Sequence, residues 1–331
     1  MAATVDAEPG GTRRLGRARD VLLGHEGVLL VILVAALALL ATRTDVFLTT
    51  DNLLNQGRLV AEIGLVALPM TFIIVTGGID LSVGSMMGLC AILLGYGWKN
   101  LGLPLPASIA LALAVGALAG FVNGWLIARI GVPPLIQTLA TLALYRGLAE
   151  GISQARSVRG YPDWFFTLGQ GDILGVPTQL WIWAVAIVLC AIVLSRTAFG
   201  RTLYVMGNNE TAARFSGLPV DRVKLAIYTF SGLMAGLAAW IFVSRVSTTR
   251  SDMGTGLELD VIAAVVLGGT SIFGGTGTIQ GTVIGVVLIQ LLKNGLALTG
   301  VKGDATIVVI GAVLILSILV ANLIQARRGG A

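Results

Sequence analysis

The chain has 331 residues, of which 56% are hydrophobic and only 12% are charged, and its formal net charge is +5. Soluble domains carry about 25% charged residues. The composition therefore excludes an ordinary soluble domain and predicts a protein that is embedded in a membrane.

Apolar residues follow one another in ten runs, which are separated by short polar or glycine-rich breaks. The runs cover residues 27–41, 59–75, 82–98, 105–128, 135–151, 180–194, 225–243, 259–268, 279–298 and 305–324. Most approach the roughly 17–25 residues that a helix needs to cross the hydrocarbon core, and none alternates as barrel strands do. We expect an all-α polytopic membrane protein of about ten transmembrane helices, with broken or re-entrant glycine-rich segments such as 259–268.

Basic residues between the runs predict the orientation of the chain. They are Arg13, Arg14, Arg17, Arg19, Arg129, Arg196, Arg201, Arg214, Arg222, Lys224, Arg327 and Arg328. With ten spans all of them fall on one side, which the positive-inside rule makes cytoplasmic. We expect a cytoplasmic N-terminal tail at 1–26, a membrane domain at 27–324 with a cytoplasmic loop at 197–224, and a cytoplasmic C-terminal tail at 325–331.

The first run has a second interpretation. Its basic head and the small residues Ala38 and Ala41 also fit a cleaved signal peptide. The tail before the run is long, however, and no clean cleavage site follows it. We therefore expect the run to be retained as the first span.

A glycine pair ends the second run, in the segment TGGIDLSVGS at 76–85. Gly77 and Gly78 either allow close helix packing or belong to an unwound stretch that faces a cavity, and the acidic residue that follows favours the unwound stretch. Asp80 is costly at membrane depth, where carboxylates tend to face a water-filled path or a partner. Asp and Ser also accept hydrogen bonds at a helix start. We expect Asp80, with Ser82, to cap and shape this loop rather than to contact a solute.

Other polar residues interrupt the apolar runs. Asn123, Gln137 and Thr141 are uncharged, and they either line a pathway for a hydroxyl-bearing solute or bridge neighbouring helices. Glu62, Glu258 and Asp260 lie near the ends of their runs, where the interface makes a charge less costly. We expect these three carboxylates to be solvated.

A weak internal repeat suggests where a substrate would pass. The segment LGGTSIFGGTG at 267–277 repeats the glycine pair, small polar turn and following apolar run of the segment at 76–85. Transporters often contain such repeats and bind substrate where the repeats meet. The candidates for a translocation pathway are Gly77, Gly78, Asp80, Ser82, Asn123, Gln137, Thr141, Gly268, Gly269 and Asn294.

The residues needed for several kinds of chemistry are missing. The single histidine, His25, stands apart from Cys90 and Cys190, which both lie in apolar runs, so we expect no metal site and two buried free thiols. An enzyme would need a facing nucleophile and base, or metal ligands. The sequence also has no G-x-x-x-x-G-K-[ST] motif, so energy from ATP would have to come from another subunit.

The loop after the sixth run carries a recognisable motif, FGRTLYVMGNNETAARFSGLPVDRVKLAIY at 199–228. TAARFSG, followed after nine residues by Ile227, resembles the E-A-A-x-x-x-G-x9-I loop of bacterial ATP-binding-cassette importer permeases. Thr211 stands where that pattern has Glu, and no L-P follows Ile227. In those permeases a short helix of this loop fits a cleft on the ATPase. The resemblance implies docking by Gly207, Asn208, Asn209, Glu210, Thr211, Ala212, Ala213, Gly217 and Val220.

The resemblance extends over residues 45–323. TGGIDLSVGS, GNNETAARFSGLPVDRVK and GTGLELDVIAAVVLGGTSIFGGTGT occur in the family's order with matched spacing. They look like the signature blocks of ribose-type sugar permeases, which are related to the branched-chain amino-acid permeases. Within that family the blocks are most similar to the rhamnose and autoinducer-2 branches.

A complex in a bacterial inner membrane is what this resemblance implies. Residues 27–324 would be the permease domain, paired with a second permease copy or paralogue in the membrane lipid. ATP-binding cassette ATPases would dock inside and hold the ATP and Mg, and a periplasmic or lipid-anchored solute-binding protein would deliver a sugar-like solute. This chain would bind no cofactor, metal or nucleic acid, and would be multi-pass with both termini cytoplasmic.

An ion-coupled secondary transporter of a small polar solute is the alternative. Such a protein is expected to carry coupling carboxylates or broken helices that coordinate an ion. Asp80 is one candidate, but no second acid in the sequence pairs with it.

Overall fold

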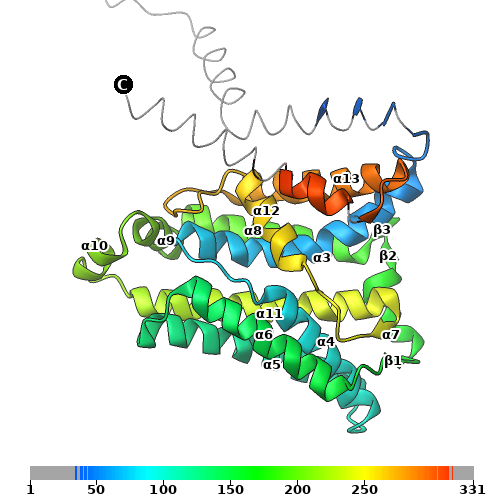
Figure 1. Ribbon diagram of the computed structural model, residues 1–331, viewed down its shortest axis with the longest axis horizontal. Helices are drawn as coiled ribbons and strands as arrows, with labels where there is room; N and C mark the ends of the chain where they lie inside the picture. Colours follow the sequence, from blue (N-terminus) through cyan, green and yellow to red (C-terminus); the bar gives the residue numbers. More distant parts are fainter. Residues whose placement is uncertain are drawn as a thin grey trace, which may run out of the picture.

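The computed structural model describes residues 34–35, 38–39, 41–42, 44–303, 305–312 and 315, and helices dominate them (Figure 1). The helices are α3 Thr50–Val75, α4 Val83–Lys99, α5 Leu105–Trp125, the π-helix η1 Leu126–Ile130, α6 Pro134–Ser153, α7 Asp163–Gln170, α8 Thr178–Arg196, α9 Ala198–Asn208, α10 Glu210–Phe215, α11 Val220–Val246, α12 Leu257–Leu267 and α13 Ile279–Leu298. Four two-residue strands, β1 Val158–Arg159, β2 Asp172–Ile173, β3 Val176–Pro177 and β4 Thr248–Thr249, form the antiparallel pairs β1–β4 and β2–β3.

Five helices in the described part of the chain are long and apolar enough to cross a membrane. They are α3, α5 continued by η1, α8, α11 and α13. The chain is therefore an all-α membrane protein, while a total of about ten spans stays a prediction. Ten of the 15 residues of the first predicted run, and 11 of the 20 residues of the last, lie outside the described residues. The predicted short run at 259–268 forms α12, which has only 11 residues.

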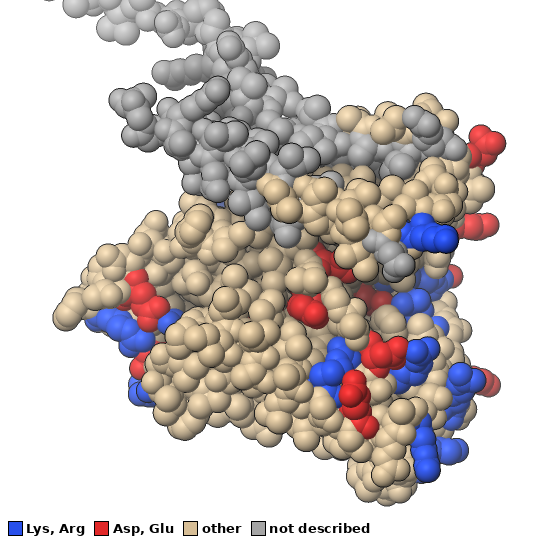
Figure 2. Space-filling model, in the orientation of Figure 1, with Lys and Arg blue, Asp and Glu red and all other residues tan. Residues whose placement is uncertain are grey.

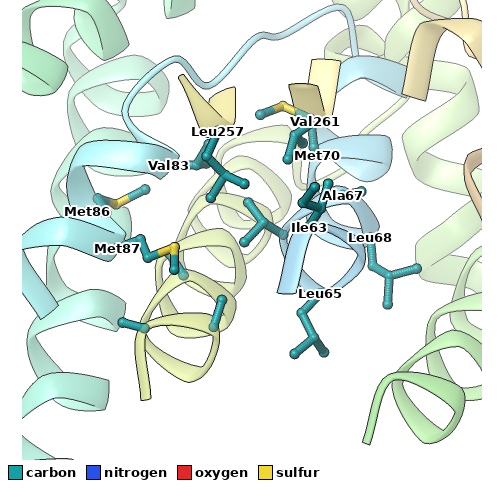
Figure 3. Close-up of a cluster of buried hydrophobic side chains, with 14 of the residues drawn as sticks. Ile63, Leu65, Ala67, Leu68, Met70, Val83, Met86, Met87, Leu257 and Val261 are labelled. Atoms are coloured by element: carbon teal, nitrogen blue, oxygen red, sulfur yellow. The ribbon is translucent and has the colours of Figure 1, made fainter. Parts of the chain in front are cut away.

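Helix α3 is the centre of the fold. It begins at Thr50, nine residues before the predicted run, because the Thr49 side chain caps it by accepting from Asn52 N. Every residue from 60 to 75 is buried, as expected of a helix that is apolar all round. Figure 3 shows its side chains packing with those of α4 and α12.

Glycines bring α5 and α11 into backbone contact. A Cβ on Gly120 would overlap the carbonyl oxygen of Tyr228, and one on Gly232 would overlap that of Gly116. Small residues allow such close approach where lipid supplies no hydrophobic drive for association. This glycine stripe positions α11 against α5.

The described chain has two polar ends. We call the end with α9 and α10 the α10 end, and the end with α7 and the four strands the α7 end; Figure 1 shows them at left and right. In Figure 2, charged side chains gather near α10 and toward the α7 end, with a mostly uncharged surface between them. This distribution fits helices that cross an apolar layer from one end to the other.

Candidate functional site

Three glycine-containing segments meet at the α10 end, and we call their meeting point the glycine junction. The segments are the end of α3 at Val75 and Gly77, the end of α9 at Gly207, and the loop after α12 at Gly274 and Gly275. Gly275 N donates to Val75 O at 2.9 Å. A Cβ on Gly207 would overlap Val75 O and Gly275 N. Backbone therefore touches backbone, and no side chain fits between the segments.

Neighbouring side chains tie α9 to the same loop. The hydroxyl of Tyr204 donates to Gly277 O at 2.7 Å. A Cβ on Gly275 would lie 2.6 Å from Asn208 Oδ1. Gly274 and Gly275 have φ of 88° and 78°, values that favour glycine. The loop after α12 is thus shaped to receive the end of α9.

The two glycines of the second predicted pair, Gly268 and Gly269, have different roles. A Cβ on Gly268 would overlap Gly281 O of α13, so this glycine allows α12 and α13 to pack closely. Gly269 has φ of 90° and turns the chain after α12. Gly77 likewise has φ of 77° at the end of α3, where Gly77 N donates to Ile74 O at 2.8 Å.

Asp80 lies at the centre of a buried hydrogen-bond network. Its Oδ1 accepts from Ser82 N at 3.0 Å and from Ser82 Oγ at 2.6 Å, and its Oδ2 accepts from Ser231 Oγ at 3.1 Å. The carboxylate is fully buried, and no ion pair of the described chain includes it. The bonds to Ser82 shape the turn before α4, but the predicted cap does not form, because Ser82 is the N-cap residue and α4 has no side-chain cap hydrogen bond. The bond to Ser231 fastens this loop to α11.

The same network continues through the polar residues of α5 and α6. Asn123 Nδ2 donates to Ser82 Oγ at 2.9 Å. Asn123 Oδ1 accepts from Thr141 Oγ1 at 2.9 Å and from Gln137 Nε2 at 3.3 Å. Of the two interpretations left open, this geometry favours helix bridging over an open pathway. Asn294 bridges α13 to α3 in the same way, through reciprocal bonds with Asn52 of 2.9 and 3.0 Å.

The predicted docking loop is a folded unit. Asn209 caps α10 by accepting from Ala212 N at 2.9 Å, and Ala213 is fully buried. Gly217 ends the segment with φ of 78°, and no atom lies within 4 Å of a Cβ built there. Val220 begins α11. Phe215 is 89% exposed, so α10 presents an apolar side chain outward.

Ion pairs hold α10 against the start of α11. Glu210 contacts Lys224 at 2.6 Å and Arg214 at 3.1 Å, and Arg214 contacts Asp221 at 2.6 Å. Burial acts to raise the pKa of Glu210, but its hydrogen bonds and charge interactions with Lys224 and Arg214 outweigh burial and lower it. The hydrogen bond to Asp221 raises the pKa of Arg214.

A cavity of about 560 Å³ lies in the half of the molecule toward the α7 end. Its walls come from α3, α4, α11, α12, α13 and the loop between α11 and α12. The lining residues are Leu59, Glu62, Ile63, Met87, Phe242, Arg245, Val246, Thr248, Arg250, Asp252, Met253, Gly254, Thr255, Leu257, Asp260, Gln290 and Lys293. None of the ten predicted pathway residues is among them. We call this space the charged cavity.

Two of the three carboxylates predicted to be solvated, Glu62 and Asp260, are paired instead, and Glu258 is partly buried. Glu62 is buried, and its oxygens accept from Arg245 Nε at 2.6 Å and from the terminal guanidinium nitrogen at 3.0 Å. Asp260 pairs with Lys293. The prediction for Glu62 was wrong because α3 extends further than its apolar run, which places residue 62 inside the helix. The signal available for Asp260 and Lys293 was their opposite charge within two apolar runs, since charges at membrane depth tend to pair; Arg245 lies two residues beyond its run.

Comparison with known proteins adds an independent observation. Residues 52–318 match the family model described as branched-chain amino acid transport system / permease component. The chain is 38% identical to the autoinducer 2 import system permease protein LsrD of Yersinia enterocolitica, over 89% of this chain and 91% of that protein. It is 39% identical to the ribose import permease protein RbsC of Escherichia coli K12, over 88% and 92%. No solved structure matches. These matches confirm the resemblance seen in the three sequence blocks.

Proposed function

We propose that this chain carries a sugar or sugar-like solute into a bacterial cell. The chain belongs to the branched-chain amino acid transport system / permease component family and is a sugar importer permease of that superfamily. The observation that supports this most directly is the likeness to two importer permeases over nearly their full lengths. The chain would lie in the inner membrane with its α10 end in the cytoplasm, as its basic residues favour.

A separate ATPase would supply the energy. The chain has no phosphate-binding motif of its own, so ATP and its magnesium would be held by that partner. The folded loop from Gly207 to Val220 offers a docking surface, since α10 is capped at Asn209 and exposes Phe215. A second permease and a solute-binding protein would complete the complex.

The glycine junction gives the docking loop a direct route into the membrane helices. α9 contacts the end of α3 and the loop before α13 through backbone atoms and the bond from Tyr204 to Gly277. A displacement of α9 would therefore move both elements together, because backbone contacts leave no flexible side chain to absorb it. We take this as the path by which ATP binding would switch the chain between two states that bind the solute differently.

The experiment compares two glycines at the α10 end. Gly217 and Gly131 both have left-handed φ, 78° and 82°, with no atom within 4 Å of an added Cβ, but only Gly217 lies in the docking loop. Gly217→Asp should abolish ATPase co-purification and solute uptake in cells, whereas Gly131→Asp should retain both at equal membrane abundance. Uptake that survives Gly217→Asp would contradict docking. Uptake that follows an ion gradient and ignores ATP depletion would instead identify a secondary transporter.

A further inference from the structure

The charged cavity has the size and the lining of a small-molecule site. Its volume of about 560 Å³ falls within the roughly 300–1,000 Å³ typical of ligand pockets, which combine apolar walls with a few polar groups. Leu59, Ile63, Phe242 and Val246 supply apolar surface. Figure 2 shows acidic and basic side chains side by side over this half of the molecule.

The charges of the lining cancel. Its acidic side chains are Glu62, Asp252 and Asp260, and its basic ones are Arg245, Arg250 and Lys293. Each acid is paired with one of the bases: Glu62 with Arg245, Asp252 with Arg250 and Asp260 with Lys293. Gln290 adds a buried amide, which donates to Gln56 at 2.9 Å. The cavity is thus rich in donors and acceptors but has no net charge.

We infer that the charged cavity binds an uncharged, polyhydroxylated solute on its way through this chain, and that its ion pairs exclude charged solutes. This inference rests on the proposed function and deepens it, because it assigns the solute to residues that the sequence motifs did not indicate.

The physical reason lies in the pairing. An anionic solute would have to take a cation such as Arg245 from its partner and leave Glu62 buried and unpaired, which is strongly unfavourable. A cationic solute would have the same effect on the basic partner. A hydroxyl group donates to a carboxylate and accepts from a guanidinium or ammonium group, so a neutral polyol can bind across an ion pair without separating its charges.

The test uses cysteines placed in the cavity wall of the complete transporter in intact cells. Leu59→Cys and Val246→Cys introduce a thiol at the lining, and labelling with a membrane-impermeant maleimide from outside measures access to it. The native Cys90 and Cys190 are buried, so the unmodified chain gives the background. Thr167→Cys, on the exposed surface of α7 and outside the cavity, is the matched control.

Three five-carbon compounds serve as probes: ribitol, which is neutral, ribonate, which is an anion, and 1-amino-1-deoxyribitol, which is a cation. We expect ribitol to slow labelling of both cavity cysteines about tenfold when it is present at about ten times its dissociation constant. The charged compounds should have no effect, and no compound should protect Thr167→Cys.

Variants of the Asp260–Lys293 pair, which is partly exposed, test the role of charge without disturbing the buried carboxylate of Glu62. Asp260→Asn leaves Lys293 unpaired, so ribonate should begin to protect. Lys293→Gln leaves Asp260 unpaired, so the amino compound should begin to protect. This reversal of charge preference is not expected if the pair is only structural.

Three results would overturn the inference: no protection by any probe, equal protection by all three in the unmodified chain, or no change of preference in the two charge variants. Sugar uptake by the same cells is measured in parallel. Uptake without protection would overturn the site and leave the proposed function standing. Protection without ATP-dependent uptake would overturn the proposed function and leave the site standing.

Discussion

The glycine junction at the α10 end and the charged cavity toward the α7 end are built in opposite ways. At the junction, backbone contacts backbone through Gly207 and Gly275. The loop that follows Gly77 is held by hydrogen bonds from Ser82 and Ser231 to Asp80. In the cavity, opposite charges surround about 560 Å³ of space. The difference teaches that backbone contact closes the α10 end, whereas paired charges enclose a space toward the α7 end. In the transport proposed above, the solute would enter that space, and the junction would have to move before it could pass.

Removing one partner of the buried ion pair should have the largest effect on stability. Glu62→Leu leaves the partly buried Arg245 without a counter-charge; the cost is at most the roughly 3–5 kcal/mol of a fully buried pair. The double variant Glu62→Leu with Arg245→Leu should recover most of that loss, because no unpaired charge remains. Thermal unfolding of the purified chain measures both, with the exposed Glu150→Leu as control. Equal loss in the single and double variants would show that packing, rather than charge, matters at this position.

Filling the glycine junction should have the next largest effect. Gly207→Ala places a methyl group against Val75 O and Gly275 N, and such overpacking costs about 1–3 kcal/mol. Uptake per folded molecule should also fall, so that the loss of transport exceeds what the loss of stability explains, because the contact is also the proposed route from the docking loop to α3. Gly147→Ala on α6 is the control, since nothing lies within 4 Å of its added Cβ. Normal uptake by Gly207→Ala would remove the junction from the mechanism.

The Asp80 network should tolerate conservative changes. If Asp80 shapes the start of α4 by accepting from Ser82 N, Asp80→Asn and Asp80→Ser should keep substantial transport, because these residues accept the same bond. Asp80→Ala leaves the buried donors of Ser82 and Ser231 without their acceptor, which costs about 1–3 kcal/mol for an unsatisfied buried group. Uptake is compared at matched membrane abundance. Loss of transport in Asn and Ser alike would show that the charge itself is needed.

The ion pairs of α10 should contribute least. Glu210 is partly exposed, so screening by water limits the Glu210–Lys224 pair to about 0–1 kcal/mol. Because the pKa of Glu210 is lowered in the folded state, this contribution is present above the unfolded pKa of about 4.3 and disappears as the pH falls through the folded value. Amide hydrogen exchange of α10 at neutral and acidic pH measures it, with Glu210→Gln as the variant that should abolish the pH dependence.

Local sequence patterns were sufficient for much of this architecture. The predicted runs at 82–98, 135–151 and 279–298 fall on α4, α6 and α13 with ends that agree within about two residues, because continuous apolar character is a property of the segment itself. The glycines at 77 and 217 do occupy turns with positive φ, which follows from the missing Cβ. The family, too, was readable from three blocks of residues.

The sequence did not show which polar residues contact one another. Asn123, Gln137 and Thr141 were left between two roles, and only the packing of α5 beside α6 shows them bonded to one another. The partner of Glu62 lies 183 positions along the chain, and no local pattern reports so distant a neighbour. Gly116 and Gly232 looked like any of the 44 glycines until α5 and α11 were placed together.

The sequence by itself determined that the chain enters a membrane, where several of its helices lie and to which family it belongs, because apolar length and short motifs are local properties. The tertiary structure alone decided where space remains and which charges enclose it. Cavities and ion pairs depend on the relative placement of α3, α11, α12 and α13, and that placement is set by side-chain volume and backbone approach between segments far apart in the chain.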